Sequence, residues 1–193
     1  VPAELVSHEA WMQSGEWMMF AGGPKTAVPG GITLVRKDGS DRRYVNRDYD
    51  YLHASGSTVN DRFVVSDTGY DGTITRLVLI DCSTGKSYLL AVIPQKGANP
   101  GHTHPNFSFD GTKVIFGISS EDYKTMCIGW MDISDIINNV ADGEEITLSD
   151  SCTTTSYGDT DFYLEKTDSG YYIKEGNHMN VNITSFEKET ADV

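Results

Sequence analysis

Cysteine is scarce in this sequence. Cys82, Cys127 and Cys152 form an odd set, and none of them belongs to a CxxC motif. A disulfide-stapled domain needs paired cysteines, and a cysteine zinc site needs closely spaced ones. We therefore expect buried thiols and neither of those two kinds of site.

Long hydrophobic runs are missing as well. No apolar segment approaches the roughly 20 residues that a helix needs to cross a bilayer, and no basic segment precedes an apolar one as in a signal peptide. Hydrophobic residues make up 38% of the 193 residues and charged residues 22%, a profile typical of a globular chain. We expect a single domain over residues 1–193, in the cytoplasm and without membrane contact.

Positive charge is in short supply. The chain has 15 Lys and Arg against 28 Asp and Glu, which gives a net charge of −13. Nucleic-acid binding depends on clustered Lys and Arg, so a nucleic-acid partner is excluded. An anionic ligand would need a local cation that overcomes the field of the whole chain, and a bound divalent metal is the obvious one.

What the sequence does contain is a series of short β-strand patterns separated by turn dipeptides. Alternating or β-branched runs predict strands at 17–20, 32–35, 62–65, 74–80, 88–93, 113–116, 171–173 and 181–186. Turn signals separate them at Asp38-Gly39, Asp71-Gly72, Thr84-Gly85, Asp110-Gly111 and Ser169-Gly170. The predicted fold class is all-β.

A polar turn that leads into a strand recurs at 13–17, 58–62, 109–113 and 167–171. Repeats of about 40–50 residues with four strands each are typical of a β-propeller. We predict about four blades of a larger ring, or a partial propeller, because a four-bladed closed ring is uncommon. The expected blades are roughly 6–50, 51–98, 99–150 and 151–193. Another copy or a partner chain would then complete the ring.

Four of the five histidines precede these repeats in the same way: His8, His53, His102 and His104. Equivalent positions of successive blades surround the same axial mouth of a propeller. We therefore expect these imidazoles to converge in one polar cavity, which is what a catalytic metal site needs. In an extended segment His102 and His104 would point to the same side, and Pro100 and Pro105 restrict the chain around them.

Three segments together match the pattern of one known family. Residues 7–11 read Ser-His-Glu-Ala-Trp, residues 53–67 hold His-Ala-Ser, Asn-Asp and Val-Val-Ser-Asp, and residues 102–111 read His-Thr-His-Pro-Asn-Phe-Ser-Phe-Asp-Gly. These runs resemble the oligogalacturonate lyases, and the likeness extends from about residue 6 to 117. Those enzymes are seven-bladed propellers that use manganese to cleave short galacturonate oligomers by β-elimination.

The resemblance implies roles for individual residues. By position, His53, His102 and His104 resemble the metal ligands, and His8 resembles the catalytic base. Asn99 stands where the family has a glutamine ligand, and Gln95 is a nearby substitute. The family also uses an arginine from an upstream blade, which has no counterpart in this sequence.

The implied function is a β-elimination lyase that acts on a small acidic oligosaccharide with a divalent metal, and manganese is the expected ion. Two alternatives stay open. The chain could be a non-catalytic propeller fragment that binds a metal or a partner, or a TolB-like scaffold whose histidines have no role. Asp67 could orient a histidine or hold a turn, and the sequence favours neither.

Overall fold

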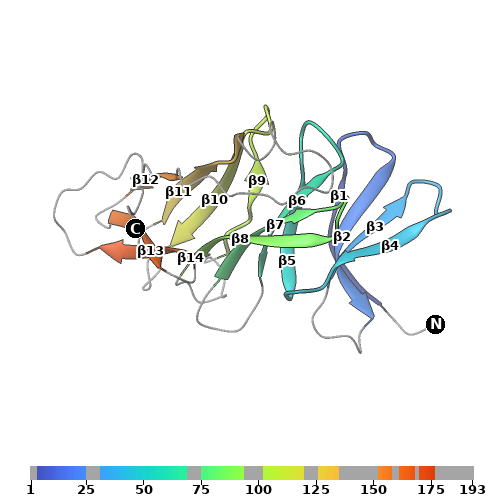
Figure 1. Ribbon diagram of the computed structural model, residues 1–193, viewed down its shortest axis with the longest axis horizontal. Coiled ribbons are helices and arrows are strands. Elements are labelled where there is room, and N and C mark those ends of the chain that lie inside the picture. The colour runs from blue at the N-terminus through green and yellow to red at the C-terminus, as the bar shows by residue number, and fades with distance from the viewer. Residues whose placement is uncertain are drawn as a thin grey trace.

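The structure is a computed structural model that describes residues 4–24, 31–68, 75–93, 102–119, 126–134, 152–157, 161–167 and 170–176. Fourteen strands are described, and most of them form three antiparallel four-stranded units (Figure 1). Within the described residues, no helix has the length and apolar character that crossing a bilayer requires.

Each four-stranded unit is called a blade here, and its strands pair in chain order. Blade 1 contains β1 (Glu4–Trp11), β2 (Trp17–Pro24), β3 (Gly31–Arg36) and β4 (Arg42–Asn46). Blade 2 contains β5 (Tyr51–Gly56), β6 (Phe63–Thr68), β7 (Thr75–Asp81) and β8 (Lys86–Ile93). Blade 3 contains β9 (Asn106–Phe107), β10 (Lys113–Ser119), β11 (Met126–Asp132) and β12 (Cys152–Tyr157).

The last described strands do not form a sheet of their own. β13 (Asp161–Thr167) and β14 (Gly170–Gly176) make a hairpin, and β14 pairs in parallel with β8 through Tyr172 and Val92. β12 pairs with β11 in blade 3, and the hairpin extends the sheet of blade 2. The fourth blade expected at 151–193 stays a prediction, because residues 177–193 lie outside the described residues. The outer edge of β8 offers unpaired backbone groups that an added strand can satisfy.

Two hydrophobic clusters lie between the blades and form the core. The first joins blades 1 and 2 and contains Met12, Met19, Ala21, Ile32, Leu34, Tyr51, Val64, Val78, Ile80 and Cys82. The second joins blades 2 and 3 and includes Phe63, Val65, Leu77, Leu79, Leu90, Phe116 and Ile118. Blade 2 therefore buries both faces, which explains why almost every residue of β6 and β7 is buried. The free thiol of Cys82 is buried as expected, and burial raises its pKa to about 12.

Polar contacts join the blades at the hairpins between their first and second strands. Ser14 in blade 1 donates its backbone N–H to Asp61 in blade 2 at 2.9 Å, and the Thr58 hydroxyl donates to the Ser108 carbonyl in blade 3 at 2.8 Å. Gly111 has a φ of +71°, and a Cβ there would lie 2.7 Å from a Val59 methyl. Glycine is therefore required by both the turn and the close approach of blade 2.

The face of blade 1 that points away from blade 2 carries exposed apolar side chains. Val6, Trp11 and Tyr44 are all exposed. Along β2 and β3, the residues that pair with these three alternate with residues of the first cluster, which face blade 2. These three side chains therefore lie on the opposite face of the sheet. An exposed apolar face of this kind commonly marks an interaction surface.

Replacing Phe63 by alanine tests the core between blades 2 and 3. Phe63 is 0% exposed, so Phe63→Ala is expected to lower the free energy of unfolding by about 3–5 kcal/mol. Urea unfolding at 25 °C measures the change. Phe109 is 97% exposed, so Phe109→Ala is the matched control and should change stability by no more than about 0.5 kcal/mol. Equal losses in both variants would contradict the assigned core.

Candidate metal centre

The histidines lie in the first strand of blades 1 and 2 and just before the first strand of blade 3. β1 lies beside β5, and β5 lies beside β9. His8 belongs to β1 and His53 to β5, while His102 and His104 directly precede β9. Four residues after His8, His53 and His104, a backbone N–H donates to the first carbonyl of the second strand: Met12 to Trp17, Ser57 to Phe63 and Ser108 to Lys113. These three histidines therefore occupy equivalent positions in the three blades.

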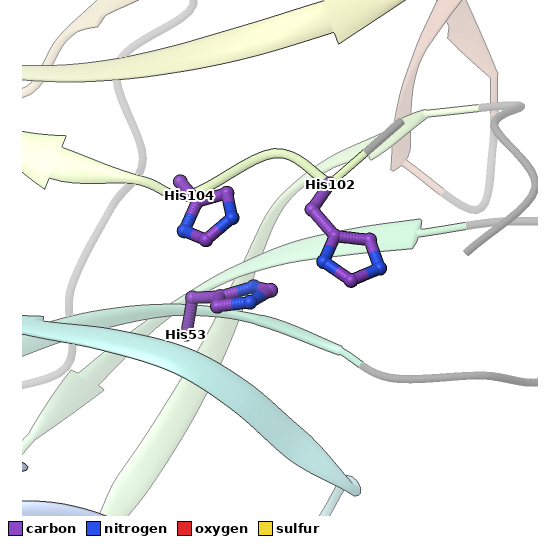
Figure 2. Close-up of side chains that lie close together, drawn as sticks. All are labelled: His53, His102 and His104. Atoms are coloured by element: carbon purple, nitrogen blue, oxygen red, sulfur yellow. The ribbon is translucent and has the colours of Figure 1, made fainter. Parts of the chain in front are cut away.

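The four imidazole rings form one cluster with His53 at its centre (Figure 2 shows His53, His102 and His104). The ring centroid of His53 lies 3.6 Å from that of His104, 4.8 Å from that of His102 and 4.4 Å from that of His8. One ring nitrogen from each of His53, His102 and His104 lies within 4.8 Å of the others. The expected convergence of these rings is thus observed, although their roles as ligands and base stay predictions.

Irregular backbone brings the rings together. In β5, Tyr51 pairs with Thr68 and Ala54 pairs with Ser66. Leu52 and His53 together therefore lie opposite a single residue of β6. A β-bulge of this kind redirects a side chain and is common beside active sites. β1 contains an equivalent irregularity between Ser7 and Ala10, around His8.

The backbone at two of the histidines is left-handed, with φ of 55° at His8 and 43° at His104. Non-glycine residues rarely adopt this conformation, and those that do cluster at functional sites. We expected His102 and His104 to share a side because their segment is extended. Their rings do lie in one cluster, but the backbone that carries them turns left-handed at His104 and is not extended there.

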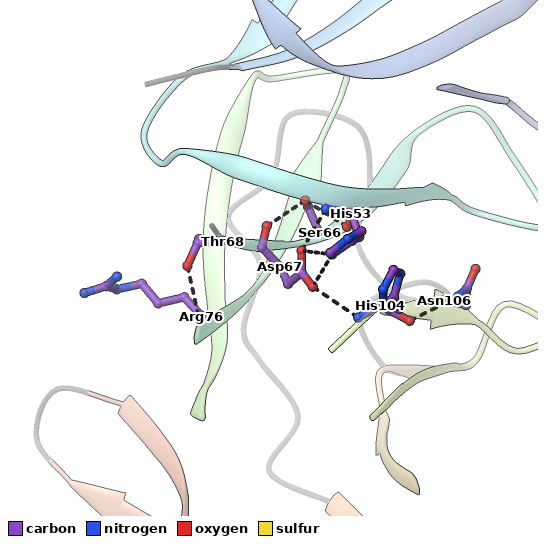
Figure 3. A network of polar contacts seen from close by, with 7 residues as sticks. All are labelled: His53, Ser66, Asp67, Thr68, Arg76, His104 and Asn106. Atoms are coloured by element: carbon purple, nitrogen blue, oxygen red, sulfur yellow. Dashed lines mark hydrogen bonds and ion pairs between the residues drawn. The ribbon is translucent and has the colours of Figure 1, made fainter. Parts of the chain in front are cut away.

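Asp67 connects two of the histidine segments (Figure 3). Its carboxylate accepts the backbone N–H of His53 at 2.7 Å and that of His104 at 3.1 Å. The same carboxylate lies 2.9 Å from Nδ1 of His53. When Nδ1 donates its proton to Asp67, Nε2 of His53 is left with a free lone pair for a metal. The structure therefore supports the orienting role over the turn role.

A cavity of about 220 Å³ opens beside the cluster, and it is formed by the first strands of all three blades. It is lined by His8, Glu9, Ala10, His53, Ala54, His104, Pro105 and Asn106. None of these lining residues is Lys or Arg, and Glu9 adds negative charge. Any anion that binds in this cavity needs a cation that the lining side chains do not supply.

Burial lowers the pKa of His8 and of His104 below the ordinary histidine value, and the neighbouring charge of His53 acts in the same direction. Asp67 partly opposes the shift in both cases. A lowered pKa favours the neutral form of both imidazoles, which is the form that binds metals and accepts protons.

The site residues expected from the sequence and those found in the structure differ at a few positions. Asn99 and Gln95, the expected fourth ligand and its substitute, lie outside the described residues. Asn106 lines the cavity and donates to the His104 carbonyl at 3.1 Å. An asparagine after His-Pro carries no sequence signal that separates a lining residue from a turn residue, so this role of Asn106 could not be predicted.

Neither a protein-family model nor a curated protein matches this sequence. Solved structures do. An oligogalacturonate lyase in complex with manganese aligns with a TM-score of 0.51 and 17% identity over 61% of this chain and 33% of the lyase. The oligogalacturonate lyase of Vibrio parahaemolyticus aligns with a TM-score of 0.53 and 17% identity over 67% of this chain and 36% of the lyase.

TolB from Acinetobacter baumannii aligns with a TM-score of 0.51 and 13% identity over 89% of this chain and 41% of TolB. The chain has a β-propeller fold. It spans about a third of the length of the two lyases, and the likeness at this identity concerns the propeller fold alone. The resemblance noted in the sequence is therefore a distant relationship of fold.

The stability of the metal-free propeller is expected to fall as pH is lowered through about 6.5, the ordinary pKa of a histidine in an unfolded chain. His8 and His104 have lowered pKa values in the folded state. As the pH falls, the unfolded chain therefore takes up protons before the folded chain does. Stability is lost until the pH reaches the pKa values of the two histidines in the folded state. Urea unfolding at pH 8 and pH 5.5 measures the difference.

The double variant His8→Gln/His104→Gln is the control for this pH dependence. It removes both groups and should show a smaller loss of stability between the two pH values. An identical loss in the variant and in the unmodified chain would assign the effect to other groups.

Proposed function

We propose that this chain belongs to a metal-dependent lyase that cleaves oligogalacturonate, or a related uronate oligosaccharide, by β-elimination. The observation that carries the proposal is the convergence of His53, His102 and His104, with the His8 ring 4.4 Å from that of His53 beside an open cavity. The distant relationship to lyases, one of them a manganese complex, agrees with it.

The three imidazoles fit a divalent metal in number, type and spacing. Two nitrogens bound to one ion at about 2.1 Å can lie at most about 4.2 Å apart. The nitrogens of His53, His102 and His104 lie within 4.8 Å of one another, so a small side-chain rotation closes the set. Imidazole suits Zn, Fe, Ni and Cu, and manganese is proposed because a structural neighbour holds it.

The reaction removes the proton at C5 of a uronate and breaks the bond between C4 and the glycosidic oxygen. A double bond forms between C4 and C5, and the leaving oxygen takes a proton from solvent. His8 lines the cavity, and its lowered pKa keeps Nδ1 or Nε2 available to accept the C5 proton. When bound, the metal neutralises charge on the uronate carboxylate and stabilises the carbanion that develops as the proton leaves.

The charge of the cavity suits the proposed uronate substrate only when a metal is bound. Its lining offers no Lys or Arg, so a uronate carboxylate depends on the metal for its counter-charge. The lining does offer backbone and amide groups, among them Asn106, that suit sugar hydroxyls. A small acidic oligosaccharide is therefore the proposed substrate.

A second candidate is a propeller that binds metal or a partner without turnover. The exposed apolar face of blade 1, with Val6, Trp11 and Tyr44, favours a further blade or chain against it. We propose that another copy or a partner chain completes the ring, and catalysis would then need groups from that second part.

Removing a ligand tests the metal site directly. His104→Ala should weaken the binding of Mn²⁺ or Zn²⁺ by more than the about 10–100-fold that the loss of an outer hydrogen-bond partner costs. Isothermal titration calorimetry measures the dissociation constant. His8→Ala is the matched control, because His8 belongs to the ring cluster but lies outside the three-ligand group, and it should retain the metal. Equal affinities in all three proteins would refute the site.

Turnover tests the lyase assignment. With Mn²⁺ and oligogalacturonate, the chain should generate the ultraviolet absorbance of an unsaturated uronate, and His8→Ala should lower kcat by about 10²–10⁴-fold while metal stays bound. A fully active His8→Ala would overturn the role of this base. A stoichiometric metal without turnover on any uronate oligomer would favour the non-catalytic propeller.

A further inference from the structure

A buried carboxylate stands in blade 2 where the neighbouring blades have none. Asp67 is the fifth residue of β6, counted from Phe63, and it is 1% exposed. The fifth residue of the corresponding strand is Ala21 in blade 1 and Gly117 in blade 3. The blade architecture therefore needs only a small residue at this position, so the carboxylate of Asp67 has some other purpose.

The donors that satisfy this carboxylate come from the histidine segments. They are the backbone N–H of His53 at 2.7 Å, Nδ1 of the same residue at 2.9 Å and the backbone N–H of His104 at 3.1 Å. A buried ionised carboxylate is costly unless it is paired and hydrogen-bonded. The bulge in β5 and the left-handed turn at His104 turn these N–H groups toward Asp67.

We propose that Asp67 is a positioning residue that fixes His53 and His104 in ligand geometry before a metal arrives, and so links blades 2 and 3 at the site. This inference rests on the proposed metal site. Asp67 touches neither metal nor substrate, and acts through the two histidines. Its carboxylate sets the tautomer and the orientation of the His53 ring, and it holds the main chain that carries the His104 ring.

Asp67→Asn tests the proposal on metal affinity. The amide keeps the size of the side chain and one acceptor oxygen, but it places an NH₂ group against N–H donors. We expect the dissociation constant for Mn²⁺ or Zn²⁺ to rise by about 10–100-fold. A folded Asp67→Asn that binds metal within twofold of the unmodified chain would overturn the proposal.

Asp81→Asn is the matched control. Asp81 is also buried, at 0% exposed, and lies at the other end of the β6–β7 pair, opposite Phe63. It accepts hydrogen bonds from Arg62 at 2.9 Å and from the Ser83 hydroxyl at 2.6 Å. Its loss should lower the urea midpoint and leave the metal dissociation constant unchanged. A similar loss of affinity in both variants would mean that Asp67 acts only through general stability.

A measurement on the metal-free chain separates this inference from the proposed function. Long-range ¹⁵N–¹H NMR of the imidazoles at pH 8, where an ordinary histidine is neutral, reports the tautomer of His53. The proposal expects the proton on Nδ1 in the unmodified chain and a mixture of tautomers in Asp67→Asn. A proton on Nε2 in the unmodified chain would refute it. If no metal binds while the Nδ1 tautomer is found, the metal function fails and the positioning role stands.

Discussion

The packing of one sheet face against another is the constraint on which this molecule depends. A lone four-stranded sheet leaves one or both apolar faces in water, and only a neighbouring sheet can cover them. Here the two core clusters lie between neighbouring blades, and blade 2 buries both of its faces because blades 1 and 3 flank it. On the opposite face of blade 1, Trp11 is exposed.

Blade packing also determines where chemistry can occur. The first strands of the three blades lie next to one another, so side chains from segments distant in sequence meet there. At this place the regular ladder is interrupted by bulges around His8 and His53 and by the left-handed turn at His104. The irregular backbone supplies free N–H groups, and the carboxylate of Asp67 takes up those of His53 and His104.

Charge connects this geometry to function. The chain carries a net charge of −13, and its cavity is lined by imidazoles and an acidic side chain rather than by Lys or Arg. Such a cavity is poorly suited to an anion by itself, but the convergence of three imidazoles makes it well suited to a divalent metal. A bound dication would reverse the local field, and the proposed acidic sugar would then find a counter-charge in the cavity.

The sequence by itself determined the fold class and the members of the histidine cluster. Turn dipeptides and strand patterns recur at a propeller period, and residues at equivalent repeat positions must meet at the axis, so His8, His53, His102 and His104 could be grouped without coordinates. The tertiary structure decided the rest. Strand register placed the bulge opposite Asp67, and the left-handed turn at His104 replaced the extended segment that was expected. The hairpin β13–β14 joined the edge of blade 2. These features depend on which backbone groups remain unpaired after the blades pack, and a local sequence pattern does not contain that information.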